Sequence, residues 1–231
     1  LIVVFDGDYL FEVVAGNVDY YSYWEDMPEA IVVGVNQDDS RSEDCNISIE
    51  DYSPSKTGAQ FYDFIENELL TFMSENYRSL NFRVAIGHGK TANFMNYFLF
   101  NTRPIFNAFV ALSPSLSSNM EENLTRRLGL ENDYKTFYYL STAALDIKRN
   151  KKNIEALHTK ISALENKNLL YAFDNFDDAT HYSLAAQSIP KALQSIFLVF
   201  QPISKAEYKE HILTLETSPV DYLLEKYETI E

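Results

Sequence analysis

Phe82-Arg83-Val84-Ala85-Ile86-Gly87-His88-Gly89-Lys90-Thr91-Ala92 is the stretch that decides the fold of this 231-residue chain. Its first five residues are mostly apolar, as in a buried strand, and residues 90–100 have the spacing of a helix. A tight turn that joins a strand directly to a helix is typical of α/β proteins. The turn itself, Gly87-x-Gly89-x-Thr91, is a weak motif, because any glycine turn after a buried strand would look similar.

The same alternation of strands and helices runs through most of the chain. Six short runs, most of them continuously apolar, are typical of strands covered on both faces, and they are residues 1–6, 30–35, 82–86, 108–112, 136–141 and 169–173. Helical patterns lie between and after them, at residues 9–24, 58–77, 90–100, 118–128, 147–164 and 183–197. This order predicts right-handed crossovers and a mostly parallel sheet flanked by helices. Residues 36–56 form a long polar loop of the kind that is often functional or mobile.

A phosphate-binding loop is a poor alternative for the glycine turn. Gly89-Lys90-Thr91 supplies the end of the Walker pattern, but that pattern needs a glycine where Val84 stands inside the strand.

The net charge of the chain limits the classes of partner that it can bind. The net charge is −15, and residues 1–80 carry −14 of it, since 17 acidic residues there face only Arg41, Lys56 and Arg78. Such a chain repels phosphate backbones and anionic bilayers, so we expect neither nucleic-acid nor membrane binding. The acidic third is either a solvated surface or a region that attracts a cationic partner. Cys45 is the single cysteine, which excludes an internal disulfide and leaves the compartment open.

Several segments in sequence order carry a resemblance to a known family. They are Phe5-Asp6-Gly7-Asp8-Tyr9, the run from Met27 to Val35, Asp39-Ser40-Arg41-Ser42-Glu43-Asp44, the run from Gly58 to Tyr77, and the run from Phe106 to Ser115. Over about residues 1–200 the chain resembles the esterase-like α/β hydrolases, which include siderophore (enterochelin-type) esterases and S-formylglutathione hydrolase-like enzymes. The resemblance implies an α/β-hydrolase fold, serine esterase chemistry without cofactor or metal, an ester-like small molecule as ligand, and a periplasmic or secreted location.

The family's nucleophile position is where this sequence departs from the pattern. The turn after the third strand carries G-x-S-x-G in this fold, with a strained serine between small residues. Here Gly89 stands at the serine position and Thr91 replaces the second glycine. Because Ala92 and Ala144 depart from the family as well, we interpret the loss as natural divergence rather than a designed knock-out. Ser113 and Ser115 are expected to form a turn.

The other catalytic positions match the family residue by residue. The acid and the histidine follow the next strands in chain order, which assigns them to Asp146 and His181. The backbone N–H groups of Lys90 and of Gly7 or Asp8 would form the oxyanion hole. Local alternatives stay open: Asp146 could cap the following helix and His181 could cap its own. Asp177 and Asp178 are fallback acids, His88 is expected to be structural, and His158 and His211 are expected on the surface.

Three functions follow from a hydrolase without its nucleophile. The chain could be a catalytically impaired or inactive homologue that acts through ligand or partner binding in the old cleft. It could instead keep a residual carboxylic ester hydrolase activity in which His181 activates water. A third possibility is a structural domain, 1–202, that docks a helical module through a C-terminal helical extension, 203–231.

Two further expectations concern the order of the strands and the recovery of hydrolase activity by substitution. The strand of residues 1–6 should lie inside the sheet, between 30–35 and 82–86, and the family's two preceding strands are absent. The run from Ala30 to Val35 would then be an exposed edge, covered by upstream residues or a second chain. Gly89→Ser should restore activity only in part, and adding Thr91→Gly should improve it, because a small residue normally follows the strained serine.

Overall fold

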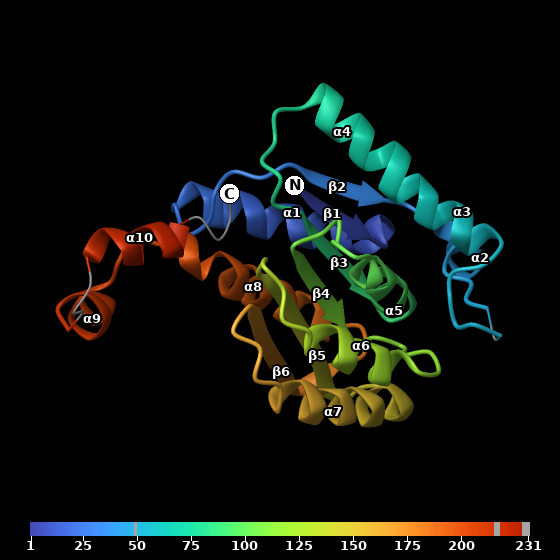
Figure 1. Ribbon diagram of the computed structural model, residues 1–231. Coiled ribbons are helices and arrows are strands. Elements are labelled where there is room, and N and C mark those ends of the chain that lie inside the picture. The colour runs from blue at the N-terminus through green and yellow to red at the C-terminus, as the bar shows by residue number, and fades with distance from the viewer. Residues whose placement is uncertain (49, 215–217, 228–231) are drawn as a thin grey trace.

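The computed structural model describes residues 1–48, 50–214 and 218–227, and its centre is a twisted sheet (Figure 1). The strands are β1 (Ile2–Phe5), β2 (Val32–Val35), β3 (Val84–His88), β4 (Ala108–Leu112), β5 (Thr136–Leu145) and β6 (Leu169–Thr180). They lie in the order β2-β1-β3-β4-β5-β6, and every neighbouring pair is parallel. The predicted fold class is thereby confirmed, as is the placement of the first strand between the second and the third.

Helices cover both faces of this sheet. One face is covered by α1 (Gly7–Tyr23) and α8 (Leu184–Phe197). The other is covered by α3 (Thr57–Asp63) and α4 (Leu70–Asn76), by α5 (Lys90–Met95), and by α6 (Met120–Leu128) and α7 (Lys148–Ser162), as Figure 1 shows. Alternate side chains of β1 reach the two cores, Ile2 and Val4 on the α1 side and Val3 and Phe5 on the other. This double burial explains why the strands are continuously apolar.

The last two strands are longer than the sequence suggested. The predicted ends were residues 141 and 173, but β5 runs to Leu145 and β6 to Thr180. The polar segment 174–180 was expected to be a loop because it lacks an apolar run. It is a strand because β6 is an edge of the sheet, so most of its side chains there face solvent while its backbone still pairs with β5.

The long loop 36–56 is partly ordered as helical turns. It contains η1 (Asp38–Ser40) and α2 (Arg41–Asp44), and an isolated antiparallel bridge joins Ile47 to Pro54. A hydrogen bond from the Ser40 hydroxyl to the Gln37 carbonyl (2.6 Å) stabilises the first turn. Arg41 of this loop pairs with Asp6, which directly follows β1, so this part of the loop lies beside the carboxyl end of β1.

The C-terminal extension is helical in its described part. It contains α9 (Lys205–Glu207), the π-type turn η5 (Tyr208–Ile212) and α10 (Pro219–Tyr227). The Glu207 carboxylate accepts hydrogen bonds from Tyr222 (2.9 Å) and Lys226 (2.6 Å), so the two arms of the extension pack on each other. None of the helices among the described residues is long and apolar enough to cross a membrane.

Candidate functional site

Gly89 forms a sharp elbow between the end of β3 and the start of α5. Its backbone has φ 59° and ψ −108°, a conformation that side chains rarely adopt. Neighbouring backbone groups hold it in place: its N–H donates to the Leu112 carbonyl (2.9 Å), and its carbonyl accepts from Asn93 (3.2 Å) and Ser115 (2.9 Å). The turn is therefore a sharp strand-to-helix elbow that glycine adopts without strain.

His181 faces this elbow across an empty space. A Cβ atom placed on Gly89 would lie 3.6 Å from Nε2 of His181, 3.7 Å from its Cε1 and 3.8 Å from Nη2 of Arg41. These are ordinary van der Waals distances, so a Cβ atom would meet its neighbours without a clash, although the φ of 59° would strain any side chain there. His181 and Gly89 are thus brought together by the sheet, with His181 Nε2 the atom nearest to the Cβ position.

Asp146 contacts the other side of the His181 ring. Its Oδ1 lies 2.8 Å from Nδ1 of His181. The sheet brings the two residues together, because each directly follows a strand and Leu145 of β5 pairs with Thr180 of β6. With Nδ1–H donating to the carboxylate, the neutral ring presents Nε2 toward Gly89 as a hydrogen-bond acceptor.

The Asp146 carboxylate is buried and fully engaged. It accepts hydrogen bonds from Thr142 Oγ1 (2.7 Å), Ser113 Oγ (2.8 Å) and the Ile147 N–H (2.7 Å) in addition to His181. Burial alone would raise the pKa of Asp146, but the hydrogen bonds from His181, Thr142 and Ser113 outweigh it and the pKa is lowered. The carboxylate is thus held in its charged form.

Ser113 is a site residue that sequence reasoning missed. It lies in a turn after β4, as expected, with a positive φ of 41°. Its hydroxyl does not face solvent, however, but lies 2.8 Å from Asp146 Oδ2 and 3.0 Å from His181 Nδ1. Its position directly after β4, next to the strand that carries the acid, was the signal that could have found it.

The fallback acids lie elsewhere. Asp177 and Asp178 are exposed on β6, and Asp178 accepts a hydrogen bond from Gln187 (3.4 Å). Asp146 does not cap the following helix. The helix α7 starts at Lys148 and no side chain caps its start, and the Asp146 carboxylate accepts only from the N–H of the adjacent Ile147 on this side. Of the two histidines expected on the surface, His211 is exposed, whereas His158 is half-buried and stacks on Phe173.

Asp6 is a second residue that the sequence did not single out. It is fully buried at the end of β1 in a left-handed conformation, φ 60°, immediately before α1. Arg41 pairs with its carboxylate and also donates to the His88 carbonyl (2.8 Å), and the Thr91 hydroxyl bonds to the same carboxylate. Asp6 therefore ties the loop after β2, the end of β1 and the elbow after β3 into one unit.

His88 contacts the backbone of His181. Its Nε2 lies 2.9 Å from the His181 carbonyl, so this nitrogen carries the proton, and Nδ1 accepts from the Tyr9 hydroxyl (2.9 Å). Burial, together with repulsion from His181, lowers the pKa of His88 from 6.5 to about 4. The expected structural role of His88 is consistent with a neutral ring that is only 1% exposed.

The three expected oxyanion donors belong to two neighbouring helix starts. Gly7 and Asp8 open α1 after β1, and Lys90 opens α5 after β3, so their N–H groups lie in the first turns of these helices. The Asp8 side chain has a separate task, since its carboxylate accepts from the N–H groups of Gln37 (3.2 Å) and Asp38 (3.3 Å). Among the described residues, no group of three or more His, Cys, Asp or Glu is placed to hold a metal ion.

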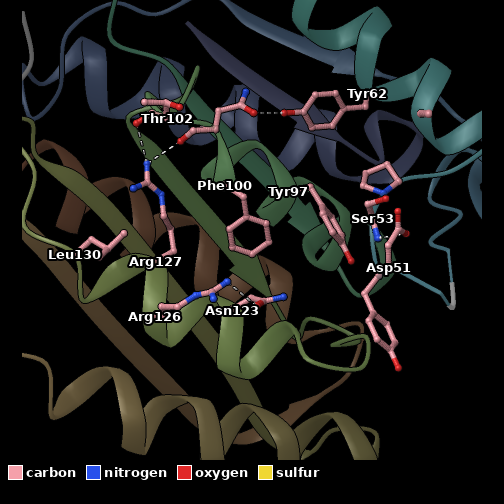
Figure 2. Close-up of a pocket in the computed structure, with 14 residues that line it drawn as sticks. Asp51, Ser53, Tyr62, Tyr97, Phe100, Thr102, Asn123, Arg126, Arg127 and Leu130 are labelled. Carbon is pink, nitrogen blue, oxygen red and sulfur yellow. Dashed lines mark hydrogen bonds between the residues drawn. The ribbon is translucent and has the colours of Figure 1, made fainter.

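A separate groove of about 700 Å³ lies between α3, α6 and η3 (Asn96–Phe100), as Figure 2 shows. Tyr62, Tyr97 and Phe100 line it, and Arg126 and Arg127 of α6 lie on its opposite wall. None of Gly89, Asp146 and His181 lines it. The groove is therefore distinct from the site at the elbow, which holds the residues arranged for chemistry.

Arg127 offers a test of how this groove is stabilised. Its guanidinium donates to the carbonyls of Leu99 (2.6 Å) and Asn101 (2.8 Å) and to the Tyr134 hydroxyl (2.6 Å). Arg127→Ala should lower the free energy of unfolding by about 2–3 kcal/mol, because hydrogen bonds from a charged donor to partly buried carbonyls are lost. Arg126→Ala, on the exposed neighbour, is the matched control and should change it by less than about 0.5 kcal/mol. Equal effects in urea denaturation would contradict this assignment.

Comparisons with known proteins place the fold. No protein-family model matches the chain, and no curated protein matches it. Among solved structures, an uncharacterised protein from Capnocytophaga ochracea is 29% identical with a TM-score of 0.88, and the match covers 99% of this chain but 64% of that one. An IroE-like serine hydrolase from Shewanella oneidensis is 21% identical with a TM-score of 0.76, covering 97% and 81%.

A third solved structure is also similar to this chain. The BES protein from Bacillus cereus is 22% identical with a TM-score of 0.72, and the match covers 84% of this chain and 80% of that one. Such identities speak for the fold, and they agree with the parallel sheet and with the elbow that follows β3. The chain therefore has an α/β-hydrolase fold, with a parallel sheet flanked by helices.

Proposed function

We propose that the chain is an esterase homologue that has lost its nucleophile and acts by binding an ester-like small molecule in the former catalytic cleft. One observation carries the proposal. Gly89 keeps the positive-φ backbone of the elbow, and the position of a serine Cβ is 3.6 Å from His181 Nε2, yet no hydroxyl is there. Acyl transfer in this fold needs such a hydroxyl within reach of the histidine.

The rest of the catalytic machinery supports binding rather than complete decay. Asp146 holds His181 in the orientation that would serve a serine, and Ser113 and Thr142 hold Asp146. The N–H groups of Gly7 or Asp8 and of Lys90 would receive the carbonyl oxygen of an ester. A ligand related to the ancestral substrate would therefore still find its polar contacts.

An activity assay with a covalent probe tests this proposal. The natural chain should turn over p-nitrophenyl acetate no more than about 10³–10⁴-fold above the uncatalysed rate, which is what a site without its nucleophile retains. A fluorescent phosphonate directed at active serines should leave it unlabelled, while an intact serine esterase in the same tube is labelled. Labelling of the natural chain would refute the proposal, because it would reveal another reactive hydroxyl.

A second candidate function rests on the exposed Nε2 of His181. The His181 side chain is 13% exposed, and in this candidate a water molecule that reaches Nε2 is activated for direct attack on an ester. Turnover that disappears in His181→Ala, without phosphonate labelling, would favour this weak hydrolase over pure binding.

A further inference from the structure

The groove between α3, α6 and η3 has the size of a small-molecule binding site. Its volume of about 700 Å³ falls within the range of roughly 300–1,000 Å³ that is usual for sites of drug-sized ligands. Gly89, Asp146 and His181 do not line it, so the chemistry of the elbow gives this groove no role. Its own lining residues indicate what it can bind.

One wall of the groove is aromatic, and its rings are held in place by their neighbours. The Tyr62 ring stacks on Phe98 with 4.2 Å between the ring centroids. The Tyr97 hydroxyl lies 3.2 Å from Ser117 Oγ, and the Tyr97 ring packs edge-on against Phe100. Rings that are already fixed lose little freedom when a ligand packs on them, so this wall suits a planar, apolar ring system.

The opposite wall carries an arginine whose guanidinium is largely unused. Arg126 and Arg127 of α6 lie on this wall, as Figure 2 shows. Arg127 is committed to the carbonyls of Leu99 and Asn101. In the part of the chain that the structure describes, Arg126 donates one hydrogen bond, to Asn123 Oδ1 (3.2 Å), and forms no ion pair. Its other N–H donors can therefore bind a carboxylate or sulfonate through two parallel hydrogen bonds.

Asp51 is the acidic side chain among the described residues that line the groove. It belongs to the loop before α3, and its carboxylate accepts from the Ser53 N–H (3.2 Å). Figure 2 shows Asp51 beside Ser53, away from Arg126 on α6. The positive and the negative charge thus stand on different sides of the groove, and Arg126 marks the side that an anionic group would occupy.

We propose that this groove binds an organic acid in which an aromatic ring system carries a carboxylate or sulfonate. The rings of the ligand pack against Tyr62, Tyr97 and Phe100, and its anionic group pairs with Arg126. The proposal does not rest on the loss of the nucleophile, because neither Gly89 nor His181 takes part in this binding.

Two fluorescent dyes with the same rings test the role of the charge. 8-Anilino-1-naphthalenesulfonate carries a sulfonate that N-phenyl-1-naphthylamine lacks, and both become fluorescent when apolar surroundings exclude water. In fluorescence titrations, the natural chain should bind the sulfonate with the lower Kd. Arg126→Ala should raise the Kd of the sulfonate about tenfold and leave that of the uncharged dye within about twofold, because only the charged hydrogen bonds are lost. Arg126→Lys, which keeps the charge, should recover part of the affinity.

Ala59→Trp tests whether the dye lies in the groove. Ala59 is an exposed residue of α3 that lines the groove, whereas the adjacent Gln60 is exposed and does not line it. Ala59→Trp should weaken binding of both dyes at least about tenfold by filling the space, and Gln60→Trp is the matched control that should bind as the natural chain does. Circular dichroism of each variant shows whether the fold is intact.

Two results would overturn the proposal. An unchanged Kd of the sulfonate in the folded Ala59→Trp or Arg126→Ala variant would mean that the dye binds elsewhere or without the guanidinium. Equal affinity of the natural chain for the two dyes would mean that the groove is an apolar site with no preference for an acid. If Ala59→Trp does not fold, the comparison of the two dyes on the natural chain and on Arg126→Ala decides the question.

Discussion

The Gly89→Ser variant is expected to hydrolyse p-nitrophenyl acetate at least about 10²-fold faster than the natural chain and to become labelled by the phosphonate. The added Oγ would extend from a Cβ that lies 3.6 Å from His181 Nε2, which puts it within hydrogen-bond reach of a ring already oriented by Asp146. Gly89→Ser combined with His181→Ala is the control and should remain inactive. A folded, unlabelled Gly89→Ser would show that the rest of the site has decayed as well.

The contacts of Thr91 change what is expected of the double variant. The sequence favoured adding Thr91→Gly, but the Thr91 hydroxyl accepts from the His88 N–H (2.9 Å) and bonds to the buried Asp6 carboxylate. Asp6 directly precedes Gly7, one of the proposed oxyanion donors. We therefore expect the double variant to be less active and less stable than Gly89→Ser alone. A kcat/KM that is higher for the double variant than for Gly89→Ser would contradict this expectation and support the one drawn from the sequence.

Replacing His88 should flatten the pH dependence of stability. The pKa of His88 in the folded chain, about 4, lies below its ordinary value of 6.5, so the unfolded chain binds more protons between these values. Above pH 6.5 His88 is neutral in both states and does not lower the free energy of unfolding. As the pH falls from 6.5 toward 4, the unfolded chain takes up the proton first, and the free energy of unfolding decreases. The loss amounts to about 3 kcal/mol for this one group.

His88→Gln removes that titration while keeping an amide near the His181 carbonyl. Urea denaturation of both proteins at a series of pH values measures the difference. The natural chain should lose about 3 kcal/mol more than the variant between neutral pH and pH 4. Parallel curves would mean that His88 is already protonated in the folded chain or is reached by water.

Much of the fold could be predicted from the sequence because burial on both faces leaves a strong pattern. The apolar run 108–112 predicts β4 with both of its ends, and the order of the segments along the chain predicts β1 inside the sheet, as the structure has it. The sequence predicts the end of the edge strand β6 too early, at residue 173, because an edge strand needs few apolar side chains. Its pairing partner β5, rather than its own composition, makes residues 174–180 a strand.

At the site, the sequence located the residues with a recognisable chain order and missed those defined by contact. Gly89, Asp146 and His181 follow strands in a fixed sequence, so each could be assigned from its position. Asp6 and Ser113 matter through partners far along the chain, Arg41 at 35 residues from Asp6 and Asp146 at 33 residues from Ser113. Such pairs have no local signature, and only the assembled sheet brings them together.

The backbone of Gly89 carries a stability–activity trade-off. A serine held at φ 59° would cost roughly 1–3 kcal/mol in strain, which an active hydrolase accepts for the sake of its exposed nucleophile. Glycine releases that strain, and it does so without disturbing the hydrogen bonds that shape the turn. At this φ, glycine is the residue that the elbow tolerates best. Under the proposed loss of the nucleophile, a return to serine would therefore require stability in reserve.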